Sequence, residues 1–395
     1  MAIGSAATRP RGIASCNTAF VRRIPISPSF RCRVYADLDT TVMQKPLRIA
    51  QIAPLSESVP PQLYGGTERV VAQLTDELVR QGHHVTLFAS GDSRTNATLV
   101  PAWPRALRLS GESGDFLTFH LLLVEMVAKR ADEFDVLHFH IAHVHESVAR
   151  RLDTPHVTTM HGRLDLPGLV PLYRELSDVP LVSISNAQRR PLSHANWIGT
   201  VHHGLPPALL PFRAVPDNYL AFLGRISPEK RVDRAIAIAT ACGIPLRIAA
   251  KVDPADRDYF RRDIEPLLHH PLVEFVGEIG EADKGEFLGR ARALLFPIDW
   301  PEPFGLVMIE SFACGTPVIA FRGGSVDEIV DDAVTGFIVE DLDAAVAAVG
   351  RIDSVDRRGC RERFEGRFTD RRMASEYVRM YRHVIERSAS SNLVA

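Results

Sequence analysis

The sequence predicts an α/β protein built from two doubly wound units, each a parallel sheet with helices on both faces. Short apolar strands alternate with amphipathic helices in two runs, which start at Leu47 and at Tyr219. The strands are apolar along nearly their whole length, as expected when helices cover both faces of a parallel sheet. A chain of 395 residues is long enough for two such units.

The first run opens with an apolar strand, followed by a helix whose apolar residues share one face. Gly82 ends this helix, because glycine readily adopts the backbone conformation that closes a helix. We expect strands at Leu47–Ala53, His84–Ala89, Asp135–Phe139, His156–Met160, Leu181–Ser185 and Thr200–His203, and helices at Thr67–Gln81 and Phe116–Arg130.

The second run follows a proline-rich stretch without periodicity, Leu205–Asn218, which we interpret as a linker. The last predicted helix, Asp370–Arg387, is amphipathic. We expect strands at Tyr219–Leu223, Leu246–Ala250, Val273–Val276, Ala293–Pro297, Pro317–Phe321 and Gly336–Val339, and helices at Arg231–Cys242, Asp256–Leu268, Ala282–Arg290, Leu306–Cys314 and Val326–Asp332.

These patterns divide the chain into segments. They are an N-terminal extension (1–44), a first Rossmann-like domain (45–205), the linker (206–218), a second Rossmann-like domain (219–367) and a C-terminal helix with a tail (368–395). Ligands of such sheets bind beyond the carboxyl ends of the strands, so we expect the active site in a cleft where the two domains face each other.

The composition excludes several classes of protein. A net charge of −2 argues against binding nucleic acid through bulk charge. No apolar run reaches the roughly 18 residues of a membrane span, although contact with a membrane surface through basic or aromatic side chains stays open. The five cysteines are scattered, without a zinc spacing, which favours a reducing compartment, and we predict a cytoplasmic protein. The oligomeric state stays open.

The first 36 residues contain six arginines and no acidic residue. This composition is typical of a transit peptide, whereas a secretory signal would need a continuous apolar centre. We favour an upstream start-codon artefact with the true start at Met43, because the first strand follows almost at once. In either case we expect the extension to be disordered and to play no part in the chemistry.

The strongest candidate site is the segment Glu302–Glu310, which follows a strand and opens a helix. Free N–H groups around Phe304, Gly305 and Leu306 are suited to hold a phosphate. Two glutamates placed around such a phosphate site suit sugar or ribose hydroxyls, which donate hydrogen bonds to carboxylates. The alternative is that both glutamates are solvent-exposed residues at a helix start and bind no ligand.

Two further clusters lie where strands end. Gly224–Arg231 follows the first strand of the second run, and Arg225 and Lys230 there can neutralise a diphosphate, with Arg231 adding positive charge. Gly65 and Gly66 lie before the first helix, where paired glycines let the backbone approach a ligand closely. Neither a G-x-G-x-x-G motif nor a Walker motif occurs, which weakens nicotinamide and P-loop hypotheses.

Histidines form the remaining candidate cluster: His138, His140, His143 and His145 at one strand end, and His161 at another. A metal-dependent hydrolase would use such a cluster but would also need carboxylate ligands, and only Glu146 adjoins it. We expect no metal site, and we expect His161 to hydrogen-bond a substrate in the cleft.

In combination these motifs resemble the retaining GT-B glycosyltransferases of glycosyltransferase family 4, over residues 47–385. The amino-acid sequence at residues 223–228 and 296–320 is especially similar to that of the family branch that contains the avilamycin-pathway glycosyltransferase. The resemblance rests on Gly65-Gly66, Thr159-Met160-His161-Gly162, Gly224-Arg225 with Glu229-Lys230, and Glu302-Pro303-Phe304-Gly305 with Glu310. It implies two Rossmann-like domains that face each other across a cleft, an acceptor-side first domain, a donor-side second domain, and a C-terminal helix that crosses back to the first.

The resemblance also implies roles at the nucleotide. Arg225 and Lys230 would grip the diphosphate and stabilise the leaving group. Glu310 would hydrogen-bond the ribose hydroxyls. Gly65 and Gly66 would let the first loop approach the diphosphate. One departure is that Arg231 stands where the family often has glycine.

The remaining implied roles concern the sugar. Glu302, with the backbone of Phe304, Gly305 and Leu306, would hold the donor sugar and phosphate, and His161 would contact the sugar from the first domain. The implied activity is metal-independent transfer from a nucleotide-diphosphate sugar, with a UDP-sugar as the default, to a glycan, lipid or small-molecule hydroxyl by same-face attack. No cofactor is expected.

Three alternatives stay open. A nucleotide-sugar epimerase of the same architecture would convert the donor without an acceptor. A metal-dependent hydrolase would use the histidine cluster. A non-catalytic protein would bind nucleotide sugars without turnover.

Overall fold

The computed structural model describes residues 45–392, except 64, 109 and 111–115. The chain divides into one unit over Met1–Lys45 and a second over Pro46–Ala395, and the helices and strands of the described residues lie in the second. The predicted extension, 1–44, lies outside the described residues.

The first sheet lies in the N-terminal half of the second unit. Within the described residues it has seven strands, all paired in parallel, in the order β3-β2-β1-β4-β5-β6-β7. The strands are β1 Arg48–Ile52, β2 His84–Ser90, β3 Thr98–Trp103, β4 Val136–Phe139, β5 His156–Thr159, β6 Leu181–Ser183 and β7 Trp197–Thr200.

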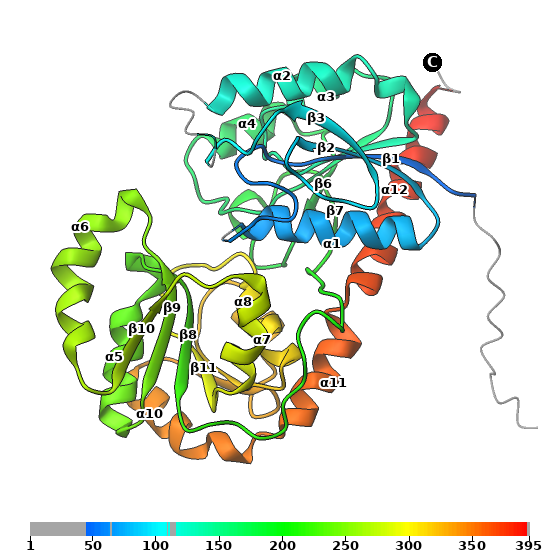
Figure 1. The fold of residues 1–395 in the computed structure, drawn as a ribbon. Helices are drawn as coiled ribbons and strands as arrows, with labels where there is room; N and C mark the ends of the chain where they lie inside the picture. The colour runs from blue at the N-terminus through cyan, green and yellow to red at the C-terminus, as the bar shows by residue number, and fades with distance from the viewer. Residues whose placement is uncertain (1–44, 64, 109, 111–115, 393–395) are drawn as a thin grey trace, which may run out of the picture. The chain divides into compact units, whose positions relative to one another are not determined.

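The second sheet lies in the C-terminal half. In the described part of the chain it has six parallel strands in the order β10-β9-β8-β11-β12-β13. These are β8 Leu220–Arg225, β9 Leu246–Lys251, β10 Val273–Gly277, β11 Ala293–Phe296, β12 Val318–Phe321 and β13 Gly336–Val339. The predicted α/β class with two doubly wound sheets is therefore confirmed (Figure 1).

Helices connect the strands of both sheets. In the first half they are α1 Gly66–Arg80, α2 Phe116–Ala128, α3 Glu146–Ala149 and α4 Leu169–Glu175. In the second half they are α5 Val232–Cys242, α6 Arg257–Tyr259, α7 Glu281–Gly289, α8 Leu306–Ala313, α9 Val326–Ile329, α10 Leu342–Arg351, α11 Arg357–Arg367 and α12 Asp370–Asn392.

The strand order places one switch point in each sheet, between β1 and β4 and between β8 and β11. At such a point the connections leave in opposite directions, which opens a crevice beyond the carboxyl ends of the two strands. Arg225 ends β8, and His140 follows β4 directly. The topology alone therefore brings candidate site residues to the two switch points.

Several predicted elements need correction. The strand predicted at Thr200–His203 lies at Trp197–Thr200 instead, because its pairing with β6 is shifted by an irregularity at Leu181 and Val182. The helix predicted at Asp256–Leu268 is a broken run of short 3-10, α and π turns. The sequence analysis also missed β3, α3, α4, α10 and α11.

The C-terminal helix α12 packs against the first half, as the predicted crossing back requires (Figure 1). Its apolar face includes Met373, Tyr377 and Tyr381, which are fully buried in one cluster with Val70 and Leu74 of α1. The helix is longer than predicted, since it ends at Asn392.

The polypeptide crosses from one half to the other twice, and the two crossings lie next to each other. Leu205 pairs with Thr369, and the backbone of Gly204 lies so close to Thr369 that a Cβ there would be 2.2 Å from its carbonyl oxygen. The residues predicted as linker, 206–218, contain no helix or strand.

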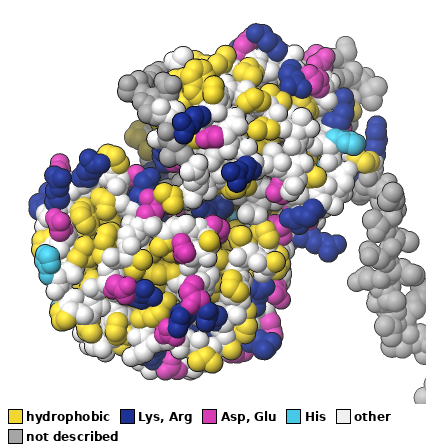
Figure 2. Space-filling model, in the orientation of Figure 1, with side chains coloured by type: hydrophobic (Ala, Val, Ile, Leu, Met, Phe, Trp, Pro, Cys, Tyr) yellow, Lys and Arg dark blue, Asp and Glu magenta, His cyan; other side chains and the backbone are white. Residues whose placement is uncertain are grey.

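On the face drawn in Figure 2, Lys and Arg side chains are interspersed with Asp and Glu side chains. In the part of the chain that the structure describes, no helix has both the length and the apolar character needed to cross a membrane.

Candidate active site

A cavity of about 530 Å³ lies between the carboxyl edges of the two sheets. Residues from both halves line it, and they include every site residue that the sequence analysis selected: Gly65, Gly66, His161, Arg225, Lys230, Glu302, Phe304, Gly305, Leu306 and Glu310. The motifs are far apart in the sequence, and the fold brings them to one place.

The N-terminus of α8 faces this cavity. Gly305 precedes the helix in the left-handed conformation (φ 78°), and a Cβ there would lie 2.7 Å from Met308 Cε. No side chain caps the helix, so its first N–H groups stay available to an anion. Glycine at this position therefore allows both the turn and the approach of a phosphate.

The loop before α8 is fixed through its carbonyl groups. Ser185 of the first half donates to the carbonyl of Pro303 (2.7 Å). The Ser325 hydroxyl donates to the carbonyl of Phe304 (2.9 Å), and the Ser325 N–H donates to that of Glu302 (2.9 Å). This loop is thus held by groups from both halves before any ligand binds.

Lys230 and Glu302 form an ion pair in the cavity wall. The Trp300 indole N–H donates to the same carboxylate oxygen of Glu302 (3.0 Å). The Lys230 ammonium lies 4.9 Å from the centre of the Trp300 ring, within the range of a cation–π interaction. The lysine is thereby held at the cavity with its charge only partly neutralised.

Arg225 is surrounded by carboxylates at the edge of the cavity. Its guanidinium lies 2.6 Å from Glu229, 3.5 Å from Asp253 and 3.7 Å from Asp256. These acids orient the planar guanidinium toward the cavity that it lines.

Arg231, the departure from the family pattern, does not line the cavity. It takes the left-handed conformation (φ 51°), in which glycine is unstrained, and this explains why glycine is common there. Its guanidinium pairs with Asp233 (2.9 Å) and Asp299 (2.8 Å). The expected additional positive charge of Arg231 at the diphosphate was therefore wrong.

Glu310 belongs to a cluster of four charged groups that joins the two halves, in which Glu310, Lys284 and Arg69 are buried and Glu281 is partly exposed. Its carboxylate lies 2.6 Å from Lys284 of α7 and 3.6 Å from Arg69 of α1. Arg69 also pairs with Glu281. Burial raises the pKa of Glu310, but the charges of Lys284 and Arg69 outweigh it, so the pKa lies below its ordinary value. Glu310 is therefore a carboxylate, able to accept hydrogen bonds.

The N-terminus of α1 approaches the cavity from the first half. A Cβ on Gly65 would lie 2.7 Å from Pro61 Cβ, so only glycine fits there. A Cβ on Gly66 would lie 3.6 Å from Leu306 Cδ1 at the start of α8. Neither helix start has an N-cap side-chain hydrogen bond, so N–H groups of both helices converge on one space, apart from that of Glu68, which bonds its own carboxylate.

The histidine cluster forms hydrogen bonds within the protein. His138 bonds Tyr381 and Thr159, and His145 bonds Thr158. His140 bonds Gln51 and His161. Among the described residues, no group of three or more His, Cys, Asp or Glu side chains is arranged to hold a metal ion.

Sequence reasoning missed Arg69, Lys284 and Glu281. No spacing in the sequence links them, because the cluster forms only when α1, α7 and α8 come together. Arg69 offered a weak signal, since it follows the paired glycines and lies in the first turn of a predicted helix.

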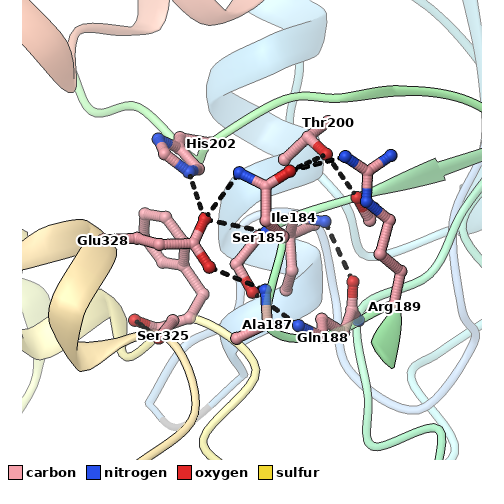
Figure 3. Close-up of polar contacts among 12 residues, drawn as sticks. Ile184, Ser185, Ala187, Gln188, Arg189, Thr200, His202, Ser325 and Glu328 are labelled. Carbon is pink, nitrogen blue, oxygen red and sulfur yellow. Dashed lines mark hydrogen bonds and ion pairs between the residues drawn. The ribbon is translucent and has the colours of Figure 1, made fainter. Parts of the chain in front are cut away.

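Glu328 of α9 connects the second half to the first (Figure 3). Its carboxylate accepts from the backbone N–H groups of Asn186 (2.8 Å) and Ala187 (2.6 Å) and lies 3.3 Å from His202 Nε2. Burial raises the pKa of Glu328, but hydrogen bonds from His202 and from the two N–H groups outweigh it and lower the pKa to about 2.

We expect Glu328→Gln to lower the free energy of unfolding at neutral pH by about 2 kcal/mol, because an amide accepts these hydrogen bonds less strongly than a carboxylate. The folded pKa of Glu328 lies below the ordinary value, so the unfolded state binds more protons as the solution becomes acidic. The stabilisation is complete above roughly pH 5 and is lost as the pH falls toward 2.

Denaturant unfolding between pH 7 and pH 3 measures this difference between wild type and variant. The matched control is Asp327→Asn on the same helix, because Asp327 is exposed and pairs only with Arg322 among the contacts that the structure gives it. A difference between wild type and Glu328→Gln that stays constant down to pH 3 would contradict the assignment.

Two family models match the chain. One, described as glycosyl transferases group 1, matches residues 212–363. The other, described as glycosyltransferase family 4, matches residues 64–243. The two matched regions together include every residue of the candidate site.

Individual proteins are similar over most of the chain. A D-inositol 3-phosphate glycosyltransferase of Mycolicibacterium smegmatis is 27% identical over 71% of this chain and 76% of its own. The crystal structure of AviGT4, a glycosyltransferase involved in avilamycin A biosynthesis, matches with a TM-score of 0.68 and 25% identity, over 86% of this chain and 98% of that one. Anabaena HepE in complex with UDP-glucose matches with a TM-score of 0.65 and 15% identity, over 87% of this chain and all of that one.

Proposed function

Because the chain belongs to the family 4 glycosyltransferases and has their GT-B fold, we propose that it transfers a sugar from a UDP-sugar to an acceptor hydroxyl. We propose that the reaction retains the anomeric configuration and needs no metal ion. One observation carries the proposal: a single cavity between the sheets is lined by two helix N-termini without a side-chain cap together with the cations of Arg225 and Lys230 and the carboxylates of Glu302 and Glu310, among other residues.

The diphosphate would lie against the starts of α1 and α8. The N–H groups there and the cations of Arg225 and Lys230 offset its negative charge, which is the role a metal ion has in other transferases. The Lys230–Glu302 ion pair supports this, because a phosphate oxygen can replace the carboxylate as a partner of the ammonium group.

The ribose and the sugar would lie on either side of the diphosphate. Glu310, kept ionised by Lys284 and Arg69, accepts hydrogen bonds from the ribose hydroxyls. Glu302 accepts from the donor sugar, and His161 contacts it from the first half. The acceptor enters along the wall of the first half, which Ser56 and Arg108 help to form, among other residues.

In the reaction, the bond between the anomeric carbon and the diphosphate oxygen breaks, and the acceptor oxygen bonds the same face of that carbon. The acceptor proton passes to the departing phosphate oxygen, so no protein nucleophile is required. Positive charge develops on the sugar and negative charge on the diphosphate. Lys230, Arg225 and the start of α8 stabilise that negative charge as it forms.

We propose that the nucleotide of the donor is uridine diphosphate. The proposal is supported by the likeness to HepE, whose structure is in complex with UDP-glucose.

The test uses slow transfer to water, which needs no knowledge of the acceptor. Wild-type protein in EDTA is incubated with UDP-, GDP- and ADP-glucose, and both the released nucleotide and the anomer of the released glucose are recorded by NMR before mutarotation. We expect UDP release with α-glucose as the first product, unaffected by EDTA.

Each alternative has its own signature in the same experiment. Release of β-glucose would overturn retention, and loss of activity in EDTA would overturn metal independence. A changed sugar on an intact nucleotide would indicate an epimerase. Binding without any release would indicate a non-catalytic protein.

A further inference from the structure

A continuous series of buried polar side chains runs from α12 to the cavity. Tyr377 and Tyr381 on α12 are fully buried at one end, and His161 lines the cavity at the other. The links are Thr159 Oγ1 to Tyr377 Oη (3.0 Å), His138 Nε2 to Thr159 Oγ1 (2.7 Å), His138 Nδ1 to Tyr381 Oη (2.7 Å), Gln51 Nε2 to Tyr381 Oη (3.0 Å), Gln51 Oε1 to His140 Nε2 (2.8 Å) and His140 Nδ1 to His161 Nε2 (2.8 Å). We call these seven residues the polar chain.

The topology explains why the polar chain is continuous. Gln51 lies on β1, His138 on β4 and Thr159 on β5, which are neighbouring strands of the first sheet. His140 and His161 follow the ends of β4 and β5. The polar chain therefore crosses the strand ends at the switch point, and α12 covers it.

Burial keeps every member neutral. It lowers the pKa of His138 and His140 well below the ordinary value and that of His161 to about 3. It raises the pKa of Tyr377 and Tyr381 above the ordinary value. At neutral pH each imidazole therefore carries one N–H, and each phenol keeps its proton.

With one proton on each ring, the direction of one hydrogen bond fixes that of the next. The Thr159 hydroxyl donates to Tyr377, so Thr159 Oγ1 accepts from His138 Nε2–H. His138 Nδ1 then has no proton and accepts from the Tyr381 hydroxyl.

The Gln51 amide gives the same direction independently. Its nitrogen donates to Tyr381 Oη, so its oxygen accepts from His140 Nε2–H. His140 Nδ1 then has no proton and accepts from His161 Nε2–H. As the structure orients them, the Thr159 hydroxyl and the Gln51 amide thus give the same direction throughout the polar chain.

The consequence for His161 is a ring nitrogen without a proton beside the cavity. Its Nδ1 is buried and has no hydrogen-bond partner among the described residues. The ring stacks on His203, with 5.4 Å between the ring centres, which holds its plane. We propose that the polar chain fixes the Nε2–H tautomer of His161, so that Nδ1 accepts a hydrogen bond from a hydroxyl group of the donor sugar.

The identity of the ligand rests on the proposed function, whereas the tautomer of His161 does not. Tyr377 and Tyr381 are positioning residues, since they act on the sugar only through His161. An acceptor-only nitrogen selects a hydroxyl group over a fluorine or ether oxygen at the same position, because only the hydroxyl can donate.

Histidine tautomers are read directly from two-bond ¹⁵N–¹H correlation spectra of ¹⁵N-histidine-labelled protein without ligand. The His161 signal is assigned by its loss in His161→Gln. We expect Nε2-protonated, neutral rings for His138, His140 and His161 in the wild type. A proton on Nδ1 of His161 would overturn the proposal outright.

Tyr381→Phe removes the hydroxyl that joins Gln51 to His138. We expect His161 to show both tautomers in this variant, and UDP-glucose to bind about fivefold more weakly, as for one lost hydrogen bond. UDP, which has no sugar, should bind as in the wild type. The matched control is Tyr173→Phe, because Tyr173 is fully buried and its hydroxyl donates to Met160 Sδ (3.6 Å), away from the polar chain.

Each outcome of the comparison has one meaning. An unchanged His161 tautomer in a folded Tyr381→Phe protein would overturn the role of the polar chain. If Tyr381→Phe does not fold, Tyr377→Phe replaces it, with the same expected direction and a smaller shift. If the wild-type protein binds neither UDP nor UDP-glucose, the proposed function and the proposed ligand of His161 Nδ1 are both overturned. The His161 tautomer, which is measured without ligand, still tests the role of the polar chain separately.

Discussion

Lys230→Ala should slow sugar transfer by about 10²–10³-fold, because preorganised charge at the developing negative charge is usually the largest catalytic contribution. Lys230 lines the cavity beside Glu302, where its ammonium group would contact the departing diphosphate. The loss should fall mainly on kcat, since the charge on the leaving group grows in the transition state. Steady-state kinetics with circular dichroism measures both activity and folding.

The neighbouring residue provides the control. Arg231→Gly also removes a cation, but Arg231 lies outside the cavity, and glycine is unstrained at its left-handed φ. Its partly exposed ion pairs are worth no more than about 1 kcal/mol each, so turnover should change little. A folded Lys230→Ala protein with near wild-type kcat would contradict the assigned role.

Glu310→Gln should destabilise the protein by about 3 kcal/mol, because it leaves the buried cations of Lys284 and Arg69 without their shared carboxylate. It should also weaken UDP binding by about 1.5–3 kcal/mol, roughly 10- to 100-fold, through weaker bonds to ribose. Pyrophosphate, which has no ribose, should lose far less affinity. Calorimetry of binding and denaturant unfolding measure these two effects separately.

A double variant separates stability from binding. Glu310→Gln with Lys284→Met replaces the buried ion pair by groups that need no counter-charge, and such replacements are often neutral or stabilising. We expect stability to return toward wild type while UDP binding stays weak. Recovery of both would mean that Glu310 has only a structural role and that another residue binds the ribose.

The candidate site could be predicted as far as it depends on motifs that follow strands. Arg225, Lys230 and Glu302 each follow a recognisable apolar strand, and the carboxyl ends of parallel strands meet at one edge. Gly305 was predictable as a helix start, and the structure adds the reason why it must be glycine.

The charged partners could not be predicted in the same way. Arg69 and Glu328 form contacts across the two halves, and Lys284 joins α7 to α8, so which side chains meet depends on how the helices and the halves pack. The histidine cluster drew attention to a metal because sequence spacing cannot reveal that Tyr381, far along the chain, supplies a hydroxyl partner.

The missed helix α11 and the missed strand β3 each lack a clear apolar pattern. Only Arg357, Cys360 and Phe364 of α11 are buried, and most of its other residues are charged or small, so it has no broad apolar stripe. Strand β3 lies at the edge of its sheet, is partly exposed and contains Pro101, which weakens a strand pattern. The fold class was predictable because long, strongly periodic elements carry it, whereas these marginal elements depend on tertiary packing.

We propose that the cavity between the two sheets binds a nucleotide sugar through the starts of α1 and α8. Hydrogen–deuterium exchange of the wild type in EDTA, with and without saturating UDP, tests it without any variant. The account predicts slower exchange over 65–69, 224–231 and 304–308, where backbone N–H groups and cations surround the diphosphate. Protection confined to other segments, or none with UDP, GDP or ADP, would contradict it.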